Sequence, residues 1–288
     1  MASGLVLIDK PQDITSFDVV AKLRKILNTR KIGHAGTLDP MATGLMVLGV
    51  ESGTKLLQYL IGMDKQYLAT IRLGAATVTD DAQGEKVSEA DASQISAAQI
   101  DAEILKLTGD ISQLPSSVSA KKIAGKRAYE LVREGKPVEL KPKDVTISRF
   151  ERTSEPKPAG TYLDFDVLVD CSSGTYVRAL ARDIGERLRV GGHLTSLRRT
   201  RIGQFYISDA QQLGTELSLT PLAQVARELF EIIEISEQTA LEVRQGKPVK
   251  LESEHQRVGL IAGDELVAIF ESAAGRLRSS TVFPKESE

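Results

Sequence analysis

One carboxylate is placed as a catalyst would require, on a glycine-rich loop between two ordered elements. It is Asp39, in the stretch Lys-Ile-Gly-His-Ala-Gly-Thr-Leu-Asp-Pro-Met-Ala-Thr-Gly that runs from Lys31 to Gly44. The glycines permit tight turns and close approach of a ligand. Pro40 pushes Asp39 toward an extended backbone, which would aim its side chain as a nucleophile or base. Spacing alone, however, favours an ordinary Asp-Pro turn.

The elements that must hold this loop follow from hydrophobic spacing. A helix capped by Thr15 or Ser16 would carry its apolar face on Phe17, Val20, Leu23 and Leu27. The loop itself is expected over residues 28–40. Further strands are predicted at Leu5–Ile8, Gly44–Val50, Tyr67–Leu73 and Thr161–Cys171, and further helices at Thr54–Leu60, Ser96–Leu107 and Tyr176–Leu188.

The last part of the chain changes character after Phe230. Four short strands are predicted around one helix, with turn signals at Gly263-Asp264 and Ala274-Gly275. The strands are Ile232–Ile235, Arg257–Ile261, Glu265–Phe270 and Arg276–Phe283, and the helix is Glu237–Arg244. This pattern predicts a small, mostly β unit.

Composition limits the function classes. The chain has 288 residues, of which 41% are hydrophobic and 26% charged, so it can bury a core. A single cysteine, Cys171, excludes an internal disulfide and favours a reducing compartment. One cysteine and three histidines do not make a usual structural zinc site. With no signal peptide and no apolar run of bilayer length, a cytoplasmic protein without a membrane partner is expected.

The net charge of −2 hides a segregation of charge. Eight acids and two bases lie between Asp80 and Asp110, whereas eight bases and three acids lie between Lys121 and Lys143. A third stretch, Arg178 to Arg201, has seven arginines and two acids. Local basic runs govern phosphate binding, although each one alone is more simply a solvated surface. Two such runs favour a polyanionic ligand.

Several separated motifs resemble, in the same order, those of bacterial tRNA pseudouridine-55 synthases. They cover roughly residues 5–215. They are Asp9-Lys10-Pro11, Gly33-His34-Ala35-Gly36-Thr37-Leu38-Asp39-Pro40, Asp64-Lys65-Gln66-Tyr67, Pro115-Ser116 with Ser119-Ala120-Lys121, Gly125 with Tyr129, Cys171-Ser172-Ser173-Gly174-Thr175-Tyr176-Val177-Arg178, and Gly192-His193-Leu194 with Leu197-Arg198-Arg199.

This resemblance implies a role for each matching residue. Asp39 would be the catalytic carboxylate, Arg178 its partner, and Tyr67 the ring that stacks on the target base. His34 would fill the space left by the flipped base. The remaining substrate-binding residues implied are Lys10, Tyr176 and Leu197, and the implied RNA-binding residues are Lys121, Lys122, Lys126 and Arg127. Without the resemblance, Tyr67 is a core aromatic, Arg178 a surface arginine and His34 as readily a structural histidine.

The implied fold is α+β, with a large, mixed, mainly antiparallel sheet, flanking helices and a cleft across it. We expect a catalytic domain over residues 1–230, an RNA-clamping insertion over residues 121–143, and a PUA-like RNA-binding domain over residues 231–288. The segment Lys121–Lys143 is expected to be flexible until RNA binds. The implied reaction isomerises uridine 55 in the T-loop of tRNA after base flipping, with no metal or other cofactor, in a protein expected to be a monomer.

The sequence also allows two other functions. The chain could be a tRNA-folding chaperone whose isomerase activity is secondary or lost, or an enzyme for another RNA uridine. The sequence also leaves three first steps for Asp39: attack at C1′, attack at C6, or removal of a ribose proton.

Overall fold

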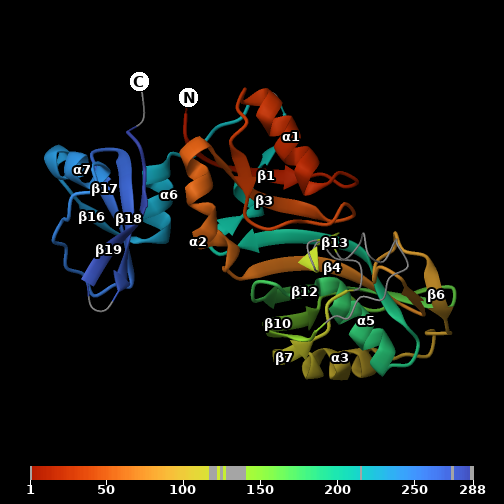
Figure 1. Ribbon diagram of the computed structural model, residues 1–288. Coiled ribbons are helices and arrows are strands. Elements are labelled where there is room, and N and C mark those ends of the chain that lie inside the picture. The colour runs from red at the N-terminus through yellow and green to blue at the C-terminus, as the bar shows by residue number, and fades with distance from the viewer. Residues whose placement is uncertain are drawn as a thin grey trace.

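The computed structural model describes residues 2–116, 122–123, 126–127, 141–214, 216–273 and 276–285. Within these ranges the chain forms one large sheet, one four-stranded sheet, two short two-stranded sheets (β5 with β6 and β8 with β9), and helices packed against the first two (Figure 1). The mixed, mainly antiparallel sheet predicted for an α+β fold is confirmed.

The large sheet has eleven strands, eight of which lie in the order β15-β1-β3-β13-β4-β12-β10-β7. The short strands β2, β11 and β14 pair at its margins with β3, β12 and β13. Two pairs, β1 with β15 and β3 with β13, are parallel, and the others are antiparallel. The bounds of its strands are β1 Gly4–Lys10, β2 Ile32–His34, β3 Thr43–Val50, β4 Lys65–Leu73, β7 Gly109–Gln113, β10 Lys143–Arg152, β11 Lys157–Ala159, β12 Tyr162–Cys171, β13 Gly192–Ile202, β14 Phe205–Tyr206 and β15 Gln211–Gln212.

Helices cover both faces of this sheet. Alternate residues of a strand point to opposite faces, and in β1 they divide between two apolar cores: Val6 and Ile8 belong to one, Leu5 and Leu7 to the other. The first core packs α1 (Ser16–Ile26), α3 (Ala97–Lys106) and α5 (Val177–Arg187) on the sheet. The second core packs α2 (Leu57–Ile61) and α6 (Leu222–Leu229). Short elements complete the framework: η1 Glu51–Lys55, β5 Ala75–Thr77, β6 Lys86–Glu89, β8 Lys122–Ile123, β9 Lys126–Arg127 and η2 Ile207–Asp209.

The predicted α1 exists, but the place given to Phe17 is wrong. Its side chain is 67% exposed, while Ser16, Val19, Val20 and Leu23 form the buried face. The helix turns about 100° per residue, so a face centred on Val19 and Val20 leaves residue 17 at its edge. Ser16, although polar, lies on the buried face because its hydroxyl forms hydrogen bonds with Leu38, directly before Asp39.

Other predictions differ at the level of elements. Residues 28–40 are not wholly a loop, since β2 pairs there with β3. The helix predicted at residues 54–60 is divided into η1 and α2. The strands β7, β10 and β13 were not predicted; β13 is rich in arginine, which conceals the alternation of a strand.

The C-terminal sheet has the order β16-β17-β18-β19 and one helix, α7 (Glu237–Arg244), as the sequence predicts. Its strands are β16 Glu231–Glu234, β17 Arg257–Ala262, β18 Glu265–Ala273 and β19 Arg276–Val282. It has an apolar core of its own, yet Ile261, Leu266, Ile269 and Phe283 join the second core of the large sheet. Its PUA-like character and the boundary at residue 230 stay predictions.

The parallel contact between β3 and β13 sets the end of the loop that carries Asp39. Arg199 pairs with Gly44, whose φ is +102°. A Cβ at Gly44 would lie 2.3 Å from the carbonyl oxygen of Arg199, so glycine permits both the turn and the close approach.

We therefore expect Gly44→Ala to lower the free energy of unfolding by about 3 kcal/mol, from the strained φ and the clash together. Gly246 is a matched control, because its φ is +76° but nothing lies within 4 Å of an added Cβ. Gly246→Ala should cost only about 1 kcal/mol. Urea unfolding of both variants measures the difference, and equal losses would show that the contact with β13 is unimportant.

Candidate active site

A cavity of about 280 Å³ opens between the Asp39 loop, defined as residues 35–42, and the N-terminal end of α5. Its walls come from the Asp39 loop, α2, β4, the turn at residues 172–176 and β13. The large sheet thus brings together four of the motifs found in the sequence, those around Asp39, Tyr67, Arg178 and Leu197. The lining residues are Gly36, Thr37, Leu38, Asp39, Ile61, Lys65, Tyr67, Ser172, Ser173, Gly174, Thr175, Tyr176, Val177, Arg178, Leu197 and Arg199.

The Asp39 loop is fixed on both sides of the carboxylate. The Ser16 hydroxyl accepts from the Leu38 N–H at 2.8 Å and donates to the Leu38 carbonyl at 3.0 Å. On the other side, the Pro40 carbonyl accepts from the Asp13 N–H at 2.9 Å and from the Lys10 ammonium at 3.2 Å. Asp39 is therefore held between two anchored residues, as catalytic geometry requires.

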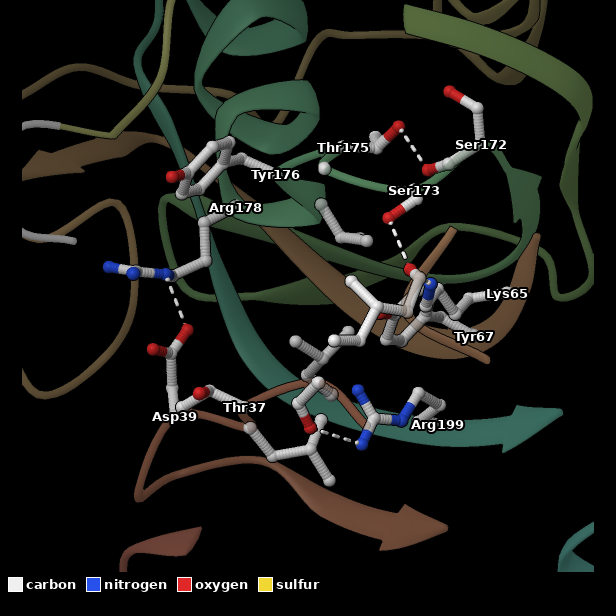
Figure 2. A pocket seen from close by; sticks show the side chains of 16 residues that line it. Thr37, Asp39, Lys65, Tyr67, Ser172, Ser173, Thr175, Tyr176, Arg178 and Arg199 are labelled. Atoms are coloured by element: carbon white, nitrogen blue, oxygen red, sulfur yellow. Dashed lines mark hydrogen bonds and ion pairs between the residues drawn. The ribbon is translucent and has the colours of Figure 1, made fainter. Parts of the chain in front are cut away.

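Asp39 faces Arg178 across the cavity (Figure 2), with 3.0 Å between Arg178 Nε and Asp39 Oδ2. The carboxylate keeps 34% of its side-chain surface exposed, whereas Arg178 keeps 6%. Arg178 lies in the first turn of α5, where the helix dipole also favours an anion. The ion pair predicted from the sequence is present, and it leaves the carboxylate open to a ligand.

The guanidinium of Arg178 is also held by two residues that do not line the cavity, Thr79 and Asp81. Its Nη1 donates to the Thr79 carbonyl at 2.6 Å and lies 3.4 Å from Asp81 Oδ2. Asp81 is buried and also accepts from the Thr79 hydroxyl. Two carboxylates and one carbonyl thus fix one arginine, which limits its side chain to the orientation that faces Asp39.

The floor of the cavity is aromatic and apolar. Tyr67 on β4 is 9% exposed and Leu197 on β13 is 7% exposed, and both line the cavity. Burial raises the pKa of the Tyr67 phenol, an effect opposed by nearby Arg199. The ring is therefore neutral and presents a surface on which a planar base can stack.

Tyr176 caps α5 and is held by Gln113 of β7. The Gln113 side chain accepts from the Tyr176 N–H at 2.8 Å and donates to the Tyr176 carbonyl at 3.1 Å. This bidentate contact fixes the wall from which the Tyr176 ring reaches the cavity.

Known proteins are similar to this chain over nearly its full length. A family model described as TruB family pseudouridylate synthase (N-terminal domain) matches residues 24–177, and one described as tRNA pseudouridylate synthase B C-terminal domain matches residues 178–231. A curated protein of Arthrobacter sp. (strain FB24), tRNA pseudouridine synthase B, is 47% identical across 100% of this chain and 99% of its own length. The protein of the same name from Rhodococcus jostii (strain RHA1) is 52% identical, over 86% of this chain and 82% of its own.

The chain belongs to the TruB family. The family predicted from the sequence is therefore confirmed, and with it the enzyme class, a pseudouridine synthase and thus an isomerase. A solved chain from an H/ACA RNP bound to a substrate RNA is similar in fold, with a TM-score of 0.69 and 23% identity, over 98% of this chain and 85% of its own. At 23% identity, this similarity supports the fold alone.

Two of the residues that the TruB resemblance places at the substrate do not line the cavity. Lys10 is fully buried behind the Asp39 loop, where its ammonium also donates to the carbonyls of Pro11 and Ile14. Burial lowers its pKa to about 8. In this structure Lys10 stabilises the Asp39 loop through its hydrogen bond to the Pro40 carbonyl, outside the cavity.

His34 is half-buried at the end of β2, just before the Asp39 loop. Burial, together with the charge of Arg199, lowers its pKa, so the ring is neutral near pH 7. Its Nδ1 is buried and has no hydrogen-bond partner among the described residues. A neutral flat ring of this kind is suited to stacking, and contact with RNA stays a prediction.

The predicted RNA-binding insertion cannot be placed. Lys121 lies outside the described residues, and of Lys122, Lys126 and Arg127 only the backbone of the paired strands β8 and β9 is described. The predicted flexibility of Lys121–Lys143 concerns residues that lie mostly outside the described part of the chain.

The third basic stretch offers less free positive charge than its seven arginines suggest. Most of its arginines form ion pairs or are buried in the structure. Arg182 pairs with Asp80 and Asp183, Arg187 with Glu103, Arg198 with Asp9, Arg201 with Asp64 and Asp170, Arg178 with Asp39 and Asp81, and Arg199 is 1% exposed. Apart from Asp183, these acids lie outside the stretch, so a count along the chain overestimates the free charge.

Sequence reasoning missed four residues that shape the site. Ser16 anchors Leu38, Asp81 holds Arg178, and Lys65 and Arg199 line the cavity. The last two stand inside the family motifs Asp64–Tyr67 and Leu197–Arg199, which was the available signal. No comparable signal marked Asp81, which lies in a run of acids.

We expect Ser16→Ala to lower the free energy of unfolding by about 2 kcal/mol, because it leaves the buried N–H and carbonyl of Leu38 unpaired. The catalytic rate should fall by at least about tenfold, since Leu38 directly precedes Asp39. Urea unfolding and single-turnover rates measure the two effects. The exposed Ser93 is the control, and Ser93→Ala should change neither; an unaltered rate in Ser16→Ala would mean that this anchor does not position Asp39.

Proposed function

We propose that this protein converts uridine 55 in the T-loop of tRNA to pseudouridine, with Asp39 as the catalytic carboxylate. The observation that carries the proposal is the Asp39–Arg178 ion pair at a cavity floored by Tyr67. The relatives named tRNA pseudouridine synthase B, matched over nearly the full chain, support tRNA as the substrate.

The geometry supports entry of a single extruded base. Asp39 is 34% exposed on its side chain, whereas Tyr67 and Leu197 below it are nearly buried. A uracil stacked within a folded RNA loop does not expose its glycosidic bond, so the nucleotide must leave the stack. Once extruded, its ring would lie against Tyr67, a contact of about 1–3 kcal/mol, with C1′ toward Asp39.

The reaction breaks the N1–C1′ bond, turns the uracil, and joins C5 to C1′. Asp39 contributes a carboxylate that Arg178 keeps ionised and oriented, whichever of the three first steps it takes. His34, at the entrance to the Asp39 loop, would stack in the RNA where the base had been. The expected partner is the T-arm of tRNA, and the monomeric state stays a prediction.

We expect Asp39→Asn to abolish turnover and to leave the affinity for T-arm RNA nearly unchanged. Asparagine has almost the same shape, but it is neither a carboxylate nucleophile nor a base. Asp264→Asn, on the exposed turn between β17 and β18, is the control and should retain full activity. Pseudouridine mapping and filter binding on the same RNA test both parts; a variant at Asp39 that still turns over near the wild-type rate would exclude this carboxylate as the catalyst.

We also expect purified protein to convert a T-arm stem-loop after exhaustive chelation and without added nucleotide. The reaction is an isomerisation that needs no redox change or external group. Mass spectrometry of the digested RNA locates the product. Dependence on a restored metal ion, or product at a uridine outside the T-loop, would contradict this part of the proposal.

A further inference from the structure

The cavity carries more positive charge than the ion pair explains. Three cationic side chains line it, Lys65, Arg178 and Arg199, against one carboxylate, Asp39. Arg178 has its charge balanced by Asp39 and Asp81. Lys65 and Arg199 form no ion pair with a carboxylate among the described residues.

Lys65 enters the cavity from the first position of β4. It is 6% exposed, and its ammonium donates to the carbonyls of Ile61, at 2.8 Å, and Met63, at 2.5 Å. Ser173 donates to the same Ile61 carbonyl, so the cavity wall is continuous at this point. The end of α2 offsets part of the charge, but an ammonium has three donors and two are occupied.

Arg199 lies on β13, below Tyr67, and is 1% exposed. Its Nε donates to the Leu45 carbonyl at 2.8 Å and its Nη2 to the Gly36 carbonyl at 3.0 Å. The second of these hydrogen bonds is the dashed line at Arg199 in Figure 2. The Tyr67 phenol is a third hydrogen-bond partner. All three partners are neutral, so Arg199 is a buried charge held in place by dipoles alone.

Such burial is expensive, because a charge removed from water loses several kcal/mol of solvation unless an opposite charge compensates it. A neutral uracil does not require two cations, since neutral donors would recognise its carbonyl oxygens as well. Fixed positive charge is useful where negative charge appears only during the reaction. Each of the three possible first steps places negative charge on the uracil ring.

We propose that Lys65 and Arg199 stabilise the uracil anion that forms when the glycosidic bond breaks, with Lys65 contacting a ring oxygen and Arg199 acting from beneath Tyr67. This inference rests on the proposed function for the site, but not on position 55, because it applies to any uridine that the enzyme converts.

The step balances without a further reagent. The N1–C1′ bond breaks and its electron pair stays on uracil, shared among N1, O2 and O4. C1′ gains a bond to the Asp39 carboxylate, or a double bond to C2′ as a C2′ proton moves to that carboxylate. If Asp39 attacks C6 first, the bond that it forms is C6–O, and this bond breaks after C5 has bonded to C1′. After rotation, C5 bonds to C1′ and the Asp39 bond breaks, or the proton returns to C2′. The proton lost from C5 is equivalent to the one that N1 gains, so atoms and charge are conserved.

The charged groups around Lys65 allow its role to be tested through the pH dependence of the rate. Burial lowers its pKa to about 8; Arg199 and Lys143 act in the same direction, and Asp64 and Cys171 oppose them. As the pH rises through about 8 the ammonium is lost, so the rate at saturating RNA should fall. Lys10 has a pKa in the same range, so its titration could also lower the rate. The variant Lys65→Arg separates the two groups, because its guanidinium stays protonated. In this variant the part of the fall in rate that is due to residue 65 should move to higher pH.

The experiment compares full-length wild type, Lys65→Met and Lys65→Arg on T-arm RNA with uridine or 5-fluorouridine at the target position. Single-turnover consumption of the target nucleotide is measured at saturating protein. Fluorine at C5 withdraws electron density and stabilises the uracil anion without help from the protein. We expect Lys65→Met to lower the rate about 100-fold on uridine and about tenfold or less on 5-fluorouridine. Lys65→Arg should lose about tenfold or less on either RNA.

Lys157→Met, on the short strand β11 away from the lining of the cavity, is the matched control and should match wild type. Equal losses of Lys65→Met on both RNAs would show a structural role and overturn the proposal. A salt dependence of affinity flatter by about 0.9, with an unchanged rate, would instead assign Lys65 to a phosphate and also overturn it. If wild type converts neither RNA, the proposed function fails first, and the comparison moves to whichever uridine wild type does convert.

Discussion

The ion pair between Asp39 and Arg178 is the interaction on which the rest of this site depends. A carboxylate on a loop is a useful catalyst only if its direction is fixed, and here both ends of the pair are restrained. Ser16 and Lys10 hold the residues on either side of Asp39, while Asp81 holds Arg178. The order of strands in the large sheet brings these groups together, since β1, β3 and β13 are neighbours.

This arrangement also explains why the charges of the chain are distributed as they are. Much of the positive charge near the site is not available at the surface, because it is buried or paired with acids from distant parts of the sequence. Two cations at the cavity, Lys65 and Arg199, form no ion pair with a carboxylate among the described residues. Their burial costs solvation free energy, and the proposed stabilisation of an anionic transition state would explain why the site keeps them.

The sequence predicted much of the architecture, and the reasons for its failures are physical. The alternation in β4 and the capping box of α3 are local, so both were predictable. β13 was missed because two of its arginines, Arg198 and Arg201, pair with carboxylates on β1 and β12, which no local pattern reveals. Asp39, Tyr67 and Arg178 were identified by family resemblance and meet at one cavity. Spacing alone favoured an Asp-Pro turn at Asp39, and long-range anchors decide otherwise.

In the proposed function, the Asp39 loop already has, before RNA binds, the conformation that meets an extruded uridine. The most direct measurement is a crystal structure of the Asp39→Asn protein with a T-arm stem-loop. We expect one uridine to leave the stack, its ring to lie against Tyr67, and its C1′ to stop within about 3.5 Å of the side chain at position 39. The contacts of Ser16 with Leu38 should be the same as in the free protein. A uridine still stacked in the RNA, or one bound with residue 39 turned away from C1′, would contradict the proposed function.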